Sequence, residues 1–203
     1  MYRISTQKSL DIDWFVNLLD TPIHIASNGG FIPRNTYKIR ELEEIYDHIM
    51  SKSDDNDVEI NESYIESLDG YEYLDNQDFT SVLTENSSVL PSKVTLFSES
   101  FVSMAKRGFC SFDRVELISP NGYELYRLIA WPKNTESIIP GWCRNRDIPL
   151  VRIIQLLMRE NETEHSDDGI LNLNIDSKKF ISLMRVEEVK DYFNFFGKRV
   201  KGK

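Results

Sequence analysis

The sequence predicts an α+β fold in a single compact domain. Three observations lead to this class: several amphipathic helical patterns, one clear β-hairpin pattern, and no regular alternation of strand and helix of the kind that builds a parallel sheet. The chain has 203 residues, of which 40% are hydrophobic and 11% are aromatic. That is enough apolar surface to bury one core.

The first third of the chain predicts apolar structure in two pieces, the second with the period of a strand, followed by a turn and a helix. Apolar residues cluster at 14–19, and Ile23 and Ile25 alternate with other residues at the period of a strand. Asn28 precedes two glycines, and these residue types adopt positive φ angles at little cost, so we expect a turn there. Between 35 and about 51 the apolar positions recur every three or four residues, which predicts an amphipathic helix.

The middle of the chain predicts a helix and then a hairpin. Phe97, Phe101 and Met104 share one helical face, with a start near 98–100 and a stop at Gly108. Two β-rich runs, 112–118 and 123–131, then flank a Ser-Pro-Asn-Gly turn. Proline at the second turn position and glycine at the fourth suit a tight turn, so we expect a β-hairpin over about 112–131.

The last quarter predicts a central buried helix, a strand and more helix. Residues 147–160 are apolar on nearly every side, which is typical of a helix surrounded by core, and we expect Asp147 to open it. A strand is expected at 170–175, with Asp176 or Ser177 capping a short helix through Met184, and a final helix carries apolar residues at 186–196.

Charge is distributed unevenly along the chain. The formal net charge is -9, from 33 acidic and 24 basic residues. Residues 41–90 contain fifteen acids and one lysine, a net of -14, so the remainder carries -9 + 14 = +5. This balance argues against general binding to nucleic acid or anionic membranes, which needs clustered cations.

Residues 52–92 predict an acidic, loop-rich excursion with short helical turns that pack partly on the main body. The segment is rich in turn-forming residues but retains aromatic side chains, which a purely solvated tail would lack. Tyrosine supplies apolar area and carboxylates speed the encounter with a basic protein. The expected binding residues are Asp54, Asp55, Asp57, Glu59, Tyr64, Tyr71 and Tyr73.

A second candidate surface mixes aromatic and basic residues. Trp131, Trp142, Arg144 and Arg146 lie close together in sequence, and such residues stack bases and hold phosphates in proteins that bind single-stranded nucleic acid. The competing interpretation is that the tryptophans cover the edge of the core while the arginines pair with the acidic segment.

Signals for catalysis are weaker. Asp147, Asp176 and Lys178 resemble, loosely, the acid-x-lysine half of the restriction-endonuclease-like pattern, and the resemblance covers only those residues. It implies a divalent metal that activates water for phosphodiester cleavage. The competing interpretation makes both aspartates ordinary helix caps. A dyad of Cys110 or Cys143 with His24 or His48 lacks any supporting signature.

We expect no cofactor and no bound metal. The histidines stand alone in the sequence, and no phosphate-binding glycine motif occurs. Oxygen ligands at 55–66 have the spacing of a calcium loop, but Ile60 stands where its turn requires glycine.

The sequence therefore favours a non-enzymatic accessory protein, similar in kind to an immunity protein or inhibitor, whose partner has a basic surface. A metal-dependent nuclease, a weak nucleic-acid module through the second surface, and a self-assembling structural protein stay open, as does the oligomeric state. The first twenty residues lack the apolar core of a signal peptide and no apolar run could span a membrane, so we expect a cytoplasmic protein with two reduced thiols.

Overall fold

A mixed sheet of seven strands forms the centre of the computed structural model, which describes residues 12–28, 39–68, 92–118, 123–160, 163–173 and 175–183. The strand order is β3-β5-β4-β2-β1-β7-β6. The strands are β1 (Asp13–Leu18), β2 (Thr21–Ala26), β3 (Val58–Ile60), β4 (Cys110–Ile118), β5 (Glu124–Pro132), β6 (Glu164–His165) and β7 (Leu171–Leu173). Together with the helices described below, this sheet confirms the α+β class.

Both apolar pieces near the N-terminus are strands and form a tight antiparallel pair, although only the second, at Ile23 and Ile25, has the period of a strand in the sequence. Phe15 lies opposite His24 and Leu18 lies opposite Thr21. Leu19 and Asp20, which connect the strands, have φ angles of 54° and 55°. Two consecutive residues with positive φ are typical of the turn whose twist matches that of a hairpin. Parallel pairing then joins β2 to β4 and β1 to β7.

The predicted hairpin is confirmed in its strands. β4 and β5 pair antiparallel, with Arg114 opposite Tyr126 and two irregularities in the register. The Ser-Pro-Asn-Gly turn at 119–122 lies outside the described residues. Of the other strand predictions, the one at 170–175 is confirmed at Leu171–Leu173.

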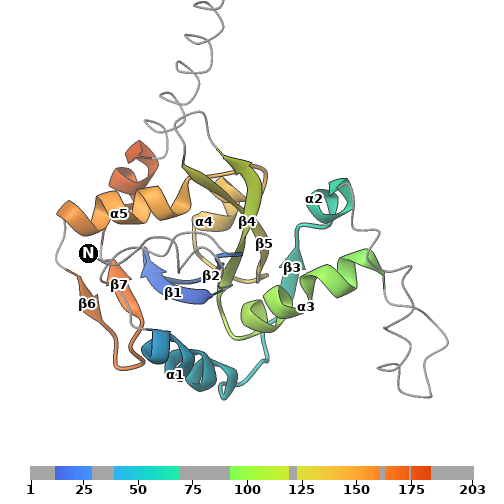
Figure 1. The fold of residues 1–203 in the computed structure, drawn as a ribbon, viewed down its shortest axis with the longest axis horizontal. Coiled ribbons are helices and arrows are strands. Elements are labelled where there is room, and N and C mark those ends of the chain that lie inside the picture. Colours follow the sequence, from blue (N-terminus) through green and yellow to red (C-terminus); the bar gives the residue numbers. More distant parts are fainter. Residues whose placement is uncertain are drawn as a thin grey trace, which may run out of the picture.

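Helices cover both faces of the sheet (Figure 1). On one face lie α1 (Ile39–Met50), α2 (Glu62–Ser67) and α3 (Lys93–Lys106). On the other lie α4 (Ile139–Cys143), α5 (Leu150–Glu160) and the helical residues 177–183. Alternation along β1 shows the division, because Trp14 and Val16 pack with α5 while Phe15 packs with α1.

The buried helix is confirmed as α5, with Ile153, Ile154 and Leu157 fully enclosed. Its start is corrected from Asp147 to Leu150. Ile148 forms an isolated β-bridge with Tyr126, and this extended pairing keeps the residues before Leu150 out of the helix.

The start of α3 is also earlier than the sequence pattern indicated. Ser92 caps the helix by accepting a hydrogen bond from the backbone of Thr95, and the helix therefore begins at Lys93. Its end agrees with the prediction, since Gly108 follows with a φ of 98°.

The acidic excursion is less loop-like than expected where the structure describes it. The short helix α2 agrees with the expected helical turns, and its Ile65 is fully buried. Residues 58–60, however, form the edge strand β3, which pairs with β5. Residues 69–91, including Tyr71 and Tyr73, and the helix expected at 186–196 lie outside the described residues.

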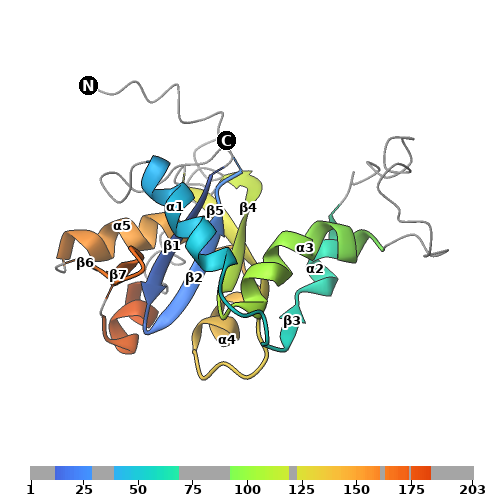
Figure 2. The same ribbon diagram turned by 90° about the horizontal axis from the view of Figure 1, so that it is seen from below.

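The two ends of the sheet carry different helices. Figure 2 shows β3, α2 and α3 together at one end and β6 and β7 at the other. No helix in the described part of the chain is long and apolar enough to cross a membrane.

Candidate functional site

Six carboxylates line up along the loop before β3, β3 itself and α2. We call this set the acidic face. Five of its members are exposed and Glu59 is half-buried. Within the described residues, none of the six forms an ion pair or a side-chain hydrogen bond. The acidic face consists of Asp54, Asp55, Asp57, Glu59, Glu62 and Glu66.

Backbone pairing fixes the acidic face to the sheet. Glu59 lies opposite Trp131 in the antiparallel register. Lys133 donates its backbone N–H to the carbonyl oxygen of Asp57 over 2.8 Å, and Asn61 donates its own to the carbonyl oxygen of Ile129 over 2.8 Å. Residues 57, 59 and 61 therefore direct their backbone groups toward β5.

Asn61 is the main polar anchor of this region. Its side chain is 7% exposed, and its amide nitrogen donates to the carbonyl oxygens of Leu128 over 2.9 Å and Arg144 over 2.6 Å. Its own carbonyl accepts the first backbone hydrogen bonds of α2, from Tyr64 and Ile65. One buried residue thus ties β5, α4 and α2 together.

Arg127 connects α2 to the loop before α5. Its guanidinium carbon lies 4.6 Å from the centre of the Tyr64 ring, and its Nε donates to the Asp147 carboxylate over 2.7 Å. Tyr64 is half-buried. The predicted binding tyrosine and the predicted catalytic aspartate therefore share one arginine, which holds both side chains in place.

The acidic face meets the predicted aromatic and basic surface at one cavity. The cavity has a volume of about 490 Å³. Glu59, Glu62 and Arg144 contribute charge to its wall, and Trp131 lines it from β5. The remaining lining residues are Val58, Ile60, Asn61, Ser63 and Asn145.

The tryptophans and arginines of this second surface differ in their exposure. Trp131 is only 6% exposed and belongs to the core, so little of its ring is accessible to a base. Trp142 is partly buried beneath Arg146, whose guanidinium lies 5.3 Å from its ring centre. Arg144 is exposed. These positions agree with tryptophans that cover the edge of the core.

The residues suggested for metal chemistry have other contacts. Asp176 accepts a hydrogen bond from the backbone of Lys178 over 2.9 Å and caps the helical residues that follow. The Asp147 carboxylate is held by Arg127. Among the described residues, no group of three or more histidine, cysteine or acidic side chains is placed to hold a metal ion.

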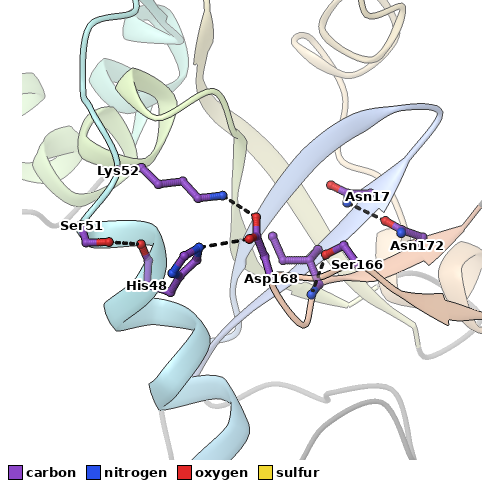
Figure 3. Close-up of polar contacts among 8 residues, drawn as sticks. Asn17, His48, Ser51, Lys52, Ser166, Asp168 and Asn172 are labelled. Atoms are coloured by element: carbon purple, nitrogen blue, oxygen red, sulfur yellow. Dashed lines mark hydrogen bonds and ion pairs between the residues drawn. The ribbon is translucent and has the colours of Figure 1, made fainter.

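A second acid-lined cavity of about 470 Å³ lies between α1 and the loop joining β6 to β7. Asp168 stands at its edge, where one carboxylate oxygen contacts His48 Nε2 at 3.0 Å and the other accepts from Lys52 Nζ at 2.5 Å (Figure 3). The hydrogen bond from Lys52 is the main cause that lowers the pKa of Asp168 below its ordinary value. His165 also lines the cavity.

Sequence reasoning missed this second cluster. His48 and His165 stand far apart in the chain and are brought to one cavity only because α1 packs beside the β6–β7 loop. No local motif marks the cluster, and its members belong to segments with no shared sequence pattern.

The sequence also did not predict a polar trio in which two members, His24 and Ser111, are buried and the third, Asp13, is half-buried. His24 is 1% exposed, its Nδ1 lies 2.5 Å from Ser111 Oγ, and its Nε2 lies 3.4 Å from Asp13 Oδ1. Ser111 is completely buried, so a substrate has no access to its hydroxyl. Cys110 is also enclosed, and burial raises the pKa of its thiol to about 12, which disfavours a nucleophilic thiolate.

Comparison with protein-family models, with curated proteins and with solved structures finds no match to this chain.

Proposed function

We propose that this chain is a non-enzymatic interaction protein that binds a basic surface of a protein partner through the acidic face. The proposal includes an inhibitor-like or immunity-like role and a cytoplasmic location. One observation carries it: six carboxylates at one end of the sheet have no cationic partner among the described residues.

Unpaired acids so close together repel one another, which does not help the chain to fold. A partner that supplies lysine or arginine side chains removes this repulsion and gains charge-assisted hydrogen bonds. Complementary charge also accelerates association. The carboxylates of the acidic face would therefore gain favourable interactions when a basic partner binds, whereas in the isolated chain they only repel one another.

The acidic face is also held in a fixed arrangement. Asn61 anchors the end of β3, and Arg127 covers Tyr64 on α2. A surface that is ordered before binding loses less conformational entropy when the partner arrives. These contacts support a specific interface over a loosely solvated charged loop.

The proposal is tested by capturing partners from a lysate of the source organism and then measuring each purified partner's affinity by titration calorimetry. One variant converts four exposed acids of the acidic face to amides, and a matched variant converts two aspartates and two glutamates elsewhere. The first combines Asp54→Asn, Asp55→Asn, Glu62→Gln and Glu66→Gln; the second combines Asp47→Asn, Asp167→Asn, Glu43→Gln and Glu164→Gln.

We expect a partner rich in lysine and arginine whose affinity falls about tenfold or more in the first variant, because each exposed ion pair contributes about 0.2–1 kcal/mol. The matched variant should bind as the unchanged protein does. Equal affinity for both variants would overturn the proposal, as would a partner without a basic surface.

A further inference from the structure

β3 is an edge strand with one unpaired side. Its register with β5 turns the backbone groups of Asp57, Glu59 and Asn61 inward, so the N–H and C=O groups of Val58 and Ile60 point away from β5. No described residue accepts from or donates to those outward groups. The cavity of about 490 Å³ is lined by this same strand.

We propose that an extended, lysine- or arginine-containing segment of the partner adds to the outer side of β3 as a further strand. This inference rests on the proposed function and specifies how the partner binds. The outward groups of Val58 and Ile60 offer two donors and two acceptors to such a strand, which is how sheet edges capture peptides in strand addition.

The side chains around β3 determine which segment fits. Val58 and Ile60 pack toward the face that carries α3, whereas Glu59 and Asn61 project to the opposite face, where Trp131 lies. Alternate side chains of an added strand follow the same two directions. Those on the Glu59 side reach the cavity, where Glu59 and Glu62 are available for a lysine or an arginine.

Charge also restricts access to this edge. Exposed edge strands invite unwanted pairing, and charged residues on the edge discourage it. Here the charges are all acidic except for Arg144, the one cation in the lining of the cavity. An acidic strand is therefore repelled and a basic one is attracted, which is how selectivity arises from repulsion of the wrong partner.

The test uses a synthetic eight-residue peptide in which lysine and valine alternate, with a glutamate and valine peptide as control. Binding is measured by titration calorimetry, and exchange of the backbone amide protons is followed by NMR. We expect the lysine peptide to bind and to slow amide exchange at Val58 and Ile60, while the glutamate peptide does not bind.

A proline variant tests the backbone contact. Val58→Pro removes one outward N–H but no hydrogen bond to β5, and Val58→Ala removes the same packing while it keeps the N–H. Thermal melting checks that both variants are folded. We expect the peptide to bind Val58→Pro about tenfold more weakly than Val58→Ala. Equal affinity for the two variants would overturn strand addition.

Charge variants separate this inference from the proposed function. Glu59→Gln with Glu62→Gln should weaken binding of the lysine peptide, and Arg144→Gln should strengthen it. If these charge effects appear while Val58→Pro and Val58→Ala bind alike, strand addition is wrong and the acidic face still binds basic partners. If proline weakens binding and none of the charge variants alters it, the edge binds strands without regard to their charge. The inference that it selects a lysine- or arginine-containing strand then fails.

Discussion

Both ends of the sheet gather acidic side chains, and they differ in one respect: within the described residues, one acid beside β6 and β7 forms ion pairs, whereas no acid of the acidic face does. Beside β6 and β7, Asp168 is held by His48 and Lys52. Beside β3, the acidic face has no ion pair with any described residue. The first arrangement joins α1 to a loop of the sheet, and the second leaves its charge available to another molecule.

This difference shows why net charge alone describes the protein poorly. An acid that is paired inside the fold contributes to stability, although only modestly when it is exposed. An acid with no internal partner contributes nothing of this kind, and its neighbours repel it. Removal of the Asp168 charge should therefore lower stability, whereas removal of charge from the acidic face should not.

The largest effect is expected at the anchor beneath the acidic face. Asn61→Ala removes the donor to two carbonyl groups, so we expect the free energy of unfolding to fall by about 1–3 kcal/mol in urea denaturation. Asn56→Ala is the control, because the exposed Asn56 side chain donates to a single carbonyl, that of Lys106. A smaller loss for Asn61→Ala than for Asn56→Ala would contradict this account of the anchor.

A somewhat smaller effect is expected at Arg127. Arg127→Gln removes the ion pair with Asp147 and the contact with Tyr64, and we expect a loss of about 1–2 kcal/mol, since both side chains of the ion pair are largely buried. Arg144→Gln removes an exposed guanidinium that pairs with no described residue and should leave stability unchanged. Equal losses in the two variants would show that neither arginine has the role assigned to it.

The paired acid should give a small, pH-dependent effect. The pKa of Asp168 is lowered in the folded protein, so its contribution is present above the unfolded value of about 3.9 and is lost as pH falls through the folded pKa. Asp168→Asn should therefore lower stability at pH 7 by less than about 1 kcal/mol. The difference should vanish in acid, and a gap that widens as pH falls would contradict the pairing.

The smallest effect on stability is expected for the acidic face. The variant with amides at 54, 55, 62 and 66 should change the free energy of unfolding by no more than about 0.5 kcal/mol, or raise it slightly, because like charges are removed. Thermal melting and urea denaturation both measure this. A loss above about 1 kcal/mol would mean that these acids have internal partners.

Much of the fold was predictable because local pattern and final structure agree. The hairpin strands, the helix α5 and the stop at Gly108 all carry their signals within a few neighbouring residues. β3 carries none: its three residues lie in an acidic segment, and they become a strand only because β5 pairs with them. Asp147 shows the opposite case, a local signal that the fold overrides. The sequence predicts that it begins a helix, but its carboxylate pairs with Arg127 and the next residue, Ile148, forms a β-bridge.

The candidate site was predicted in part for the same reason. Segment charge located the acidic residues, and nearness in sequence located Trp131 and Arg144. Their common cavity depends on the pairing of β3 with β5 and on Asn61, which are contacts between distant segments. The cluster around Asp168 depends wholly on such contacts, so no signal in the sequence pointed to it.

The most direct test maps where a basic strand binds. Backbone amide chemical shifts are recorded by NMR while the lysine and valine peptide is added to the full chain. The account predicts shifts confined to 54–66 and to Ala130, Trp131 and Lys133, which pair with this segment, with none at His48, His165 or Asp168. Shifts that centre on the cavity beside α1, or that spread evenly over both ends of the sheet, would contradict it.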